Sequence, residues 1–472
     1  MYPMEPTYTE HINQLIKEGK PVKEAIIKEY IDKQDTTQAN IGEDYYYKRN
    51  DITKRVIYKY DNDGKKVIDT DATNNKIASG RHKLLVDQKV GYLVGDPVTI
   101  GYKEEKDIEP IIELLGDEFD DYLTELVKNA SNKGVDWIHP YIDEDGEFDY
   151  IIVPMQEFIP IYDNSKRKNL IAGIRHYKLD HDDIVKVEFW EENTVTYYEI
   201  HNGSLVLDSD EEVNPSPHFT YSKGETTNGY GWGKVPFVEF KNNEDNIPDI
   251  HFYKDSIDIY DKIMSDSSNT IEDIQEFLYI INGYAGTEID QAVTNLKRYK
   301  GVAVDGDNAG VDILQGEMPM NSVGSYLDRL RDTIYEEGQG VDTNTDKFGN
   351  SPSGIALKFL FSLLDMKANV LERKFTKALK QFMWFVTEYA KMNGVGEYDP
   401  KKFTFTFNKS MLMNDAEQVQ MAQQSAGLGI SQQTLRENHP WVTDAELEKQ
   451  RYEEETSRVP DLDQNLDGEE DE

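Results

Sequence analysis

The stretch Gly349-Asn350-Ser351-Pro352-Ser353-Gly354-Ile355-Ala356-Leu357-Lys358-Phe359 decides the fold of this chain. There a polar, glycine-rich segment passes into an apolar run without a further helix breaker until Gly394. Ser351 is suited to accept from the unpaired N–H groups of a helix start, and Pro352 suits the first helical position. The pattern predicts one helix over 352–393, which is roughly 63 Å long at about 1.5 Å per residue.

A helix of this length has two interpretations. Helices of globular domains usually have about three turns, so the length indicates a large assembly. A long helix with a flexible loop at its start is what the bore of a DNA-conducting ring needs. The alternative is a buried core helix behind an ordinary surface loop, and the stretch alone does not decide between them.

Charge and cysteine content exclude several classes of protein. The 472 residues suffice for about three domains. Basic residues number 51 and acidic residues 90, so the net charge is −39. This balance argues against a protein that coats nucleic acid, but it is compatible with a channel wall to which DNA must not stick. The absence of cysteine excludes disulfides, thiolate catalysis and thiolate metal sites.

The sequence predicts a protein made and used in the cytosol. Its apolar runs are all shorter than the roughly 18–20 residues that cross a bilayer. The segment Met1–Glu10 has neither a basic nor an apolar region, so we expect no signal peptide.

Residues 1–248 are predicted to form an α+β domain with helices on both sides of a mainly antiparallel sheet. Apolar residues at helical spacing predict a helix over 8–34. Three hairpins are expected, with turns at Asp61–Gly64, Asp143–Gly146 and Asn202–Gly203. Alternation in Lys186–Trp190 indicates a strand with one wet face. The polar segment 208–232 is expected to be a surface excursion, and Tyr45–Tyr47 either a helix end on a core or a base-stacking surface.

The second half of the chain is predominantly helical by its pattern. Acidic amphipathic helices are expected over 251–274 and 319–337. They flank a compact block in which Lys300–Val304 and Val311–Leu314 are predicted to pair as strands. The end of the chain, 444–472, has 13 acidic and 3 basic residues, and its last dozen residues are expected to be disordered.

The motifs that signal an enzyme are missing from the sequence. The acidic turns Asp61–Gly64 and Asp143–Gly146 lack the first carboxylate and the closing Glu of a calcium loop. There is no phosphate-binding G-x-x-x-x-G-K-[ST] loop, no nucleophile elbow and no H-E-x-x-H pair. We therefore predict no enzyme activity, no catalytic residue, no metal site and no cofactor.

The predicted long helix reverses the sign of the charge. It has seven basic and three acidic residues, a net charge of +4 within a strongly acidic chain. This charge either faces acidic neighbouring subunits or lines the path of DNA. The alternative is pairing between residues four apart on an exposed, soluble face.

Several segments together resemble the portal proteins of long-tailed double-stranded DNA bacteriophages, in particular siphoviruses of Gram-positive hosts. The resemblance runs in order from about residue 20 to 455, and the part around Lys83–Pro97 is the most specific. The segments are Asn74–Ile77, Leu84–Val98, Gly233–Asn243, Gly349–Phe359, and Gly429–Ser431 with Asp444–Glu448.

The resemblance implies a ring of twelve subunits around a channel at one capsid vertex. It implies, in chain order, a wing over 1–248, a stem helix over 249–274, a clip over 275–318, a second stem helix over 319–337, a tunnel loop over 338–351, a long helix returning to the wing over 352–409, and a crown with an acidic tail over 410–472. The order predicted from the residues agrees, because two stem helices must flank a clip and a loop must precede the long helix.

The resemblance also implies sites and partners. The expected DNA-contacting residues of the tunnel loop are Gly340, Asp342, Asn344, Asp346 and Lys347, and those of the clip that bind the motor or connector are Glu288, Asp290, Lys297 and Arg298. The implied partners are further copies of the chain, duplex DNA, the large subunit of terminase, major capsid and scaffold proteins, and head-completion or adaptor proteins. The protein is expected in the virion after assembly in the host cytoplasm. The alternative is another phage head protein, such as a capsid or head-completion subunit.

Overall fold

The protein forms two compact units in a computed structural model. The first unit comprises residues 1–342 and 363–410, and the second comprises 343–362 and 411–472. The structure describes residues 17, 24–70, 72–163, 165–166, 168–179, 184–223, 226–274, 278–282, 310–314, 320–342, 354–410, 419, 423–424, 429–437, 439, 442 and 445–457. Each unit is described by itself below.

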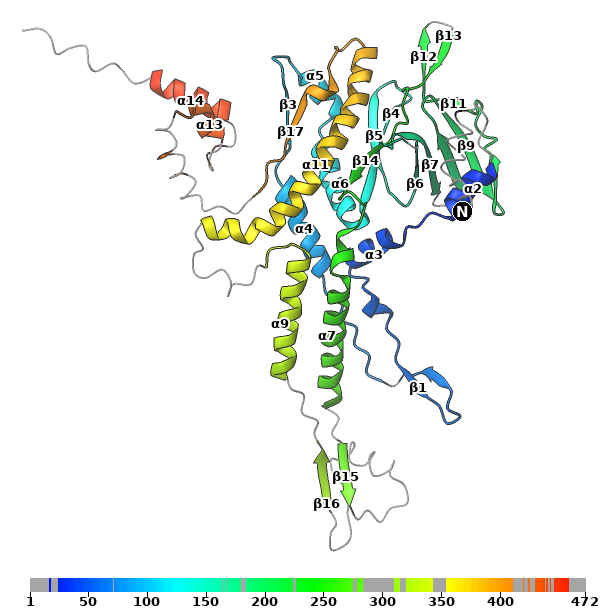
Figure 1. The fold of residues 1–472 in the computed structure, drawn as a ribbon, viewed down its shortest axis with the longest axis vertical. Helices are drawn as coiled ribbons and strands as arrows, with labels where there is room; N and C mark the ends of the chain where they lie inside the picture. The colour runs from blue at the N-terminus through cyan, green and yellow to red at the C-terminus, as the bar shows by residue number, and fades with distance from the viewer. Residues whose placement is uncertain are drawn as a thin grey trace, which may run out of the picture. The chain divides into compact units, whose positions relative to one another are not determined.

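Antiparallel strands build two principal sheets in the first unit (Figure 1). The larger has the order β10–β9–β8–β7–β6, with β11 beside β9; the smaller has the order β14–β4–β5. Their bounds are β4 (Val135–Ile142), β5 (Phe148–Val153), β6 (Phe158–Tyr162), β7 (Leu170–Lys178), β8 (Val185–Trp190), β9 (Thr194–His201), β10 (Ser204–Leu207), β11 (Ser216–Pro217) and β14 (Val238–Lys241). The predicted α+β class is confirmed, but two sheets take the place of the single one expected.

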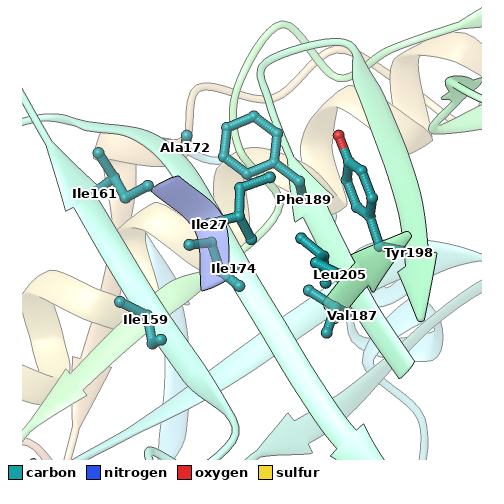
Figure 2. Close-up of a cluster of buried hydrophobic side chains, with 9 residues drawn as sticks. All are labelled: Ile27, Ile159, Ile161, Ala172, Ile174, Val187, Phe189, Tyr198 and Leu205. Atoms are coloured by element: carbon teal, nitrogen blue, oxygen red, sulfur yellow. The ribbon is translucent and has the colours of Figure 1, made fainter. Parts of the chain in front are cut away.

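The larger sheet buries one face under α2 (Glu24–Asp32), as Figure 2 shows. Ile27 of this helix is fully buried among side chains from five strands. Residues two apart along a strand point to the same face, which is why each strand contributes alternate residues to this core. The cluster comprises Ile27, Ile159, Ile161, Ala172, Ile174, Val187, Phe189, Tyr198 and Leu205.

All three predicted hairpins are present. The first is β1 (Tyr58–Tyr60) with β2 (Lys66–Ile68), the second is β4 with β5, and the third is β9 with β10. The third turns at Asn202 (φ 49°) and Gly203 (φ 80°), both left-handed, as a two-residue turn between antiparallel strands requires.

Short helices surround a second buried core. α3 (Thr37–Tyr46), α4 (Arg81–Val94) and η2 (Asp249–Phe252) contribute side chains to it, and η1 (Asp51–Lys54), α5 (Glu109–Leu115) and α6 (Phe119–Lys133) are further short helices of the unit. Tyr45 is buried in this core, beside Leu85 and Tyr253. Tyr45 therefore belongs to a helix end packed on a core, whereas Tyr47 is 59% exposed.

Two long helices leave this core side by side (Figure 1). They are α7 (Lys254–Ile274) and α9 (Met320–Glu337). The Ser256 hydroxyl donates to Glu337 at 2.8 Å, and Ile257 and Ile334 share the buried cluster, so α7 starts where α9 ends. The helices are thus antiparallel, and residues 275–319 connect their far ends.

The predicted long helix is α11 (Gly354–Met392), 39 residues long. Beyond its last turn, the N–H of Val395 donates to the carbonyl of Ala390, and the N–H of Gly394 to that of Lys391. Gly394 has a φ of 72°, so it adopts the left-handed conformation of a C-terminal helix cap. The two hydrogen bonds are those of a Schellman motif, which ends the helix. After η3 (Pro400–Lys402), β17 (Phe403–Thr406) pairs antiparallel with β3 (Thr99–Tyr102). The predicted cap residues Ser351 and Pro352 lie outside the described residues.

The structure adds to or differs from three predicted details. The strand over Val311–Leu314 exists as β16 (Gly310–Leu314), but it pairs with β15 (Leu278–Asn282); the expected partner over 300–304 lies outside the described residues. β8 has no wet face over its second half, because Glu188 is buried and accepts from Trp190 Nε1 at 2.8 Å. The segment 208–232 includes the hairpin β12 (Phe219–Lys223) and β13 (Thr226–Tyr230) and ends in the buried Trp232, whose ring lies against aromatic side chains.

The second unit contains the first turns of α11 together with α13 (Gln432–Glu437) and α14 (Ala445–Ser457), which contact each other. Among the described residues of both units, no helix is long and apolar enough to cross a membrane.

Candidate functional site

The candidate site is the segment Gly338–Asp342, which leads from α9 into residues 343–353 and is called the root segment below. At its start, Gln339 has a φ of 53°, and the N–H of Gly340 donates to the carbonyl of Tyr335 at 2.9 Å. A Cβ on Gly340 would lie 2.2 Å from Leu85 Cδ2, and one on Gly338 would lie 2.5 Å from Leu85 Cδ1. The two glycines are therefore required by close packing on α4, whereas the left-handed residue is the glutamine between them.

Side chains from α4 and α9 hold the other end of the root segment. Gln88 of α4 accepts from Val341 N at 3.0 Å and donates to Val341 O at 2.7 Å. Arg331 of α9 forms an ion pair with Asp342, whose side chain is only 9% exposed. Backbone and side chain of the segment are thus fixed as far as Asp342.

Lys367 of α11 joins the root segment to the start of α7. Its ammonium group lies 2.9 Å from the carbonyl of Gly338 and 2.8 Å from Asp249 Oδ2. Asp249 also accepts from Lys89 of α4 at 3.1 Å and from Asn242 at 2.9 Å. We call Lys89, Asp249 and Lys367 the charged node; it joins α4, α11 and η2, the short helix that precedes α7, and it contacts the backbone that follows α9.

Burial makes the charged node sensitive to the loss of any member. Lys89 and Asp249 are almost completely buried. Desolvation lowers the pKa of Lys89 to about 8, against the attraction of Asp249. Burial alone would raise the pKa of Asp249, but the ammonium groups of Lys367 and Lys89 outweigh it and hold this pKa well below its usual range. A single carboxylate therefore neutralises two cations in an environment of low dielectric constant.

A neutral histidine lies behind the charged node. His82 of α4 donates through Nε2 to Asn132 Oδ1 at 3.0 Å, so its Nδ1 accepts from the Tyr253 hydroxyl at 2.7 Å. Burial lowers the pKa of His82 to about 4. Since every polar group here has a structural partner, the arrangement is suited to transmitting displacement between helices rather than to acid–base chemistry.

Comparison with known proteins identifies the family. A family model described as "Phage portal protein, SPP1 Gp6-like" matches residues 27–460. The chain belongs to this portal protein family. It is 39% identical over 476 aligned residues to the portal protein of Bacillus phage SPP1, covering 99% of this chain and 94% of that one. It is 33% identical over 436 residues to the portal protein of Clostridium phage phiCD119, covering 87% and 91% of the two chains. The predicted portal resemblance is confirmed and is favoured over a capsid or head-completion subunit.

The predicted portal site residues are only partly described by the structure. Gly340 and Asp342 lie in the root segment, where Asp342 is paired with Arg331. The carboxylate of Asp342 thus has a partner within the subunit, and its expected contact with DNA stays a prediction. The other residues lie outside the described ranges: Asn344, Asp346 and Lys347 of the tunnel loop, and Glu288, Asp290, Lys297 and Arg298 of the clip.

The basic residues of the long portal helix divide into two groups. Lys367 and Lys374 have partners outside the helix, Asp249 and Glu244 respectively. Conversely, Lys409 neutralises two acidic residues of α11, with contacts of 3.1 Å to Asp365 and 3.0 Å to Glu372. A sequence spacing of four is therefore not that of the partners of Lys367, Lys374 and Lys409. Among the basic side chains of α11 that the structure describes, Arg373, Lys377 and Lys391 are exposed.

Sequence reasoning missed the residues that anchor the root segment of this portal family member. A signal was available for Lys89, which lies four residues after Leu85 and four before Leu93, on the apolar face of its helix. A lysine at such a position must find a buried anion. Gln88 and Lys367 gave no comparable signal, because polar residues at the edge of a helical stripe are usually solvated.

One further acidic cluster has a structural explanation. Oxygen atoms of Glu199, Asp208 and Asp210 lie within 4.8 Å of one another. Lys186 donates to Glu199 and, at 2.8 Å, to Asp208. The ammonium group thus supplies the positive charge that this cluster needs.

Proposed function

We propose that the chain forms the portal ring of a tailed phage, with twelve copies around an axial channel at one capsid vertex. Duplex DNA would enter the capsid through this channel during packaging and leave through it at ejection. The observation that carries the proposal is the identity of 39% to a portal protein over nearly the full length of both chains. Because it covers both units, it extends to the architecture and not only to one domain.

The antiparallel pair α7 and α9 supports the assignment of the stem. Both helices have exposed acidic residues, and their far ends are connected by the block that contains the β15–β16 pair. A block connected in this way projects from the end of the stem. We infer that it is the clip, on which the terminase large subunit docks and to which head-completion or adaptor proteins bind later.

The root segment supports a mechanical role for the predicted tunnel loop. The root segment is held by Arg331, Gln88 and Lys367, so a force on residues 343–353 reaches the body of the subunit at these three side chains. Lys367 passes the force along α11, and Asp249 passes it to the start of α7. We infer that the loop follows the DNA while the charged node couples it to the stem and to the wing.

The remaining parts of the chain are assigned by the same proposal. Residues 1–248 form the wing, facing capsid and scaffold proteins, and residues 410–472 form the crown. Assembly takes place in the host cytoplasm and the ring remains in the virion. The isolated ring hydrolyses no ATP, because the sequence lacks a phosphate-binding loop.

Native mass spectrometry of the purified protein tests the ring. Twelve chains of 54.4 kDa give 12 × 54.4 ≈ 653 kDa. Electron micrographs should show rings with an axial hole. Monomers or dimers alone, at micromolar concentration and across salt conditions, would contradict the proposal.

Substitutions in the predicted tunnel loop and clip test the assignments within the ring. Lys347→Glu should change packaging efficiency or the length of packaged DNA without loss of rings. Lys391→Glu makes the same charge change at an exposed position at the far end of α11 and serves as the control. Glu288→Lys and Lys297→Glu should leave rings intact and impair packaging or tail attachment. Clip variants that fail to form rings would show that this block is needed for ring assembly and would contradict its assignment as a docking site.

A further inference from the structure

The hairpin β1–β2 forms an arm, residues 55–70, that has an apolar face. In its register Tyr58 lies opposite Ile68 and Tyr60 opposite Lys66, so these four side chains share one face. Val56 precedes Tyr58 by two residues and belongs to the same side. The other side carries Lys59 and Asp69, whose charged groups pair at 2.9 Å.

Both ends of the arm are fixed to α7. Arg55 forms an ion pair with Asp266 at 2.6 Å, at the start of the arm. On the far side of the arm, the N–H of Asn75 donates to Asn269 at 2.7 Å, and the N–H of Ile77 to Ser265 at 2.9 Å. The arm is thus held at the level of residues 265–269 of this helix.

No described element of the subunit covers the apolar face. Its exposed fractions are 42% for Val56, 51% for Tyr58, 75% for Tyr60 and 59% for Ile68. A two-stranded hairpin is marginally stable in water by itself. A contiguous aromatic and aliphatic face on such a hairpin therefore indicates a binding surface.

We propose that this face of the arm packs on the α7–α9 pair of the neighbouring copy of the chain. The inference rests on the proposed ring. Rotation about a ring axis parallel to the stem keeps each residue at its own height. The arm therefore meets its neighbour at the level of the stem residues to which its own ends are bonded.

The stem offers a complementary surface at this height. Because α9 runs antiparallel to α7 and Ile257 lies level with Ile334, Met320 of α9 lies near the level of Ile271. Large apolar side chains are exposed along this part of both helices: Ile271, Met320 and Tyr326. The exposed carboxylate of Asp328 complements Lys66, whose ammonium group lies 4.2 Å from the centre of the Tyr58 ring on the apolar face of the arm.

Two different surfaces of one chain would meet in this contact. An interface of that kind is heterologous, so it continues from copy to copy and forms a ring when the rotation between copies closes. The arm of each copy therefore binds the α7–α9 pair of the next copy and links the two stems.

Assembly of an arm variant tests the proposal. In Tyr58→Ser/Tyr60→Ser/Ile68→Ser the replaced side chains are exposed, so the subunit should fold with an unchanged thermal midpoint. Native mass spectrometry gives the protein concentration at which half of the chains are in rings. For the variant this concentration should be at least about tenfold higher than for the wild type, which corresponds to about 1.4 kcal/mol. The control, Lys59→Ser/Asp69→Ser, changes the opposite side of the same hairpin and should assemble like the wild type.

Cross-linking locates the acceptor surface. A benzophenone amino acid at position 60, in chains mixed with isotopically labelled wild type, should form cross-links to residues 254–274 or 320–337 of the labelled copy. Cross-links confined to the wing or to the same chain would overturn the proposed acceptor. Rings that survive the triple substitution at unchanged concentration would overturn the arm contact alone. A wild type that stays monomeric would overturn the ring and the arm contact together.

Discussion

The side-chain amide of Gln88 pairs with both backbone polar groups of Val341, at 3.0 Å to N and 2.7 Å to O. The two residues are 253 positions apart in sequence. An amide that donates and accepts in this way replaces the partner that a neighbouring strand would provide. It fixes the root segment one residue before Asp342, which Arg331 holds by an ion pair.

Removal of this amide should release the root segment. In Gln88→Ala, the N–H and carbonyl of Val341 lose their partners in a half-buried position, which should cost about 1–2 kcal/mol of unfolding free energy. Hydrogen exchange of the Val341 amide should become faster. Gln88→Glu keeps an acceptor for the N–H and should exchange more slowly than the alanine variant. Equal exchange in wild type and Gln88→Ala would show that the amide does not hold the segment.

The end of α9 should respond in opposite directions to two glycine changes. Gln339 is left-handed, so Gln339→Gly should stabilise the protein by about 1 kcal/mol. Gly340→Ala places a methyl group 2.2 Å from Leu85 Cδ2 and should destabilise it by about 1–3 kcal/mol. Both are measurable by denaturant unfolding. A stabilising Gly340→Ala would show that the contact with α4 yields easily.

Loss of the carboxylate from the charged node should be costly. Asp249→Asn leaves Lys89 and Lys367 without their shared counter-ion and should cost about 3–5 kcal/mol of unfolding free energy. The penalty should decrease at pH 9, where Lys89, with a pKa already lowered to about 8, releases its proton. Adding Lys89→Met should recover part of the loss. If Asp249→Asn costs less than about 1 kcal/mol at pH 7, the node does not bind these helices together.

His82 should make the protein sensitive to mild acid. Its pKa is about 4 in the folded protein, against an ordinary value of 6.5, so the unfolded chain takes up the proton first. The stabilisation is complete above pH 6.5 and is lost as the pH falls towards 4, by up to about 3 kcal/mol. Asp249 and Lys367 face this ring, and Asp249 keeps its charge over that range, since its pKa lies well below it.

A glutamine at position 82 should flatten this part of the stability profile. The measurement is the free energy of unfolding of His82→Gln at several values between pH 7 and 4. His251→Gln replaces an exposed histidine and should follow the wild type. Parallel profiles for wild type and His82→Gln would contradict the assignment.

Local signals predicted the elements of the fold well and their pairing less well. The turn at Asn202–Gly203, the stop at Gly394 and the length of α11 follow from backbone chemistry within a few residues. The sequence pattern did not predict that β16 pairs with β15. Pairing depends on which two segments the intervening chain brings together, and the pattern within either strand does not report this. The division into two sheets was missed for the same reason.

The site was predictable as a place but not as a set of contacts. The glycine-rich pattern located the segment after α9, yet it suggested backbone freedom at Gly338 and Gly340, where the structure shows tight packing on Leu85. The ion pair of Asp249 with Lys367 joins residues from two separate parts of the sequence. No spacing within one segment reports such a contact.

The position of α11 and β17 has a consequence for synthesis on the ribosome. The aromatic rings of Phe240 and Phe375 lie 5.1 Å apart, those of Tyr150 and Phe382 lie 5.0 Å apart, and β17 is the last strand of its unit. A nascent chain that ends before α11 therefore leaves the partners of these rings facing water, and β3 lacks its only described neighbour. The unit is completed only when nearly the whole chain has been translated, so an unfinished chain cannot supply a subunit for assembly.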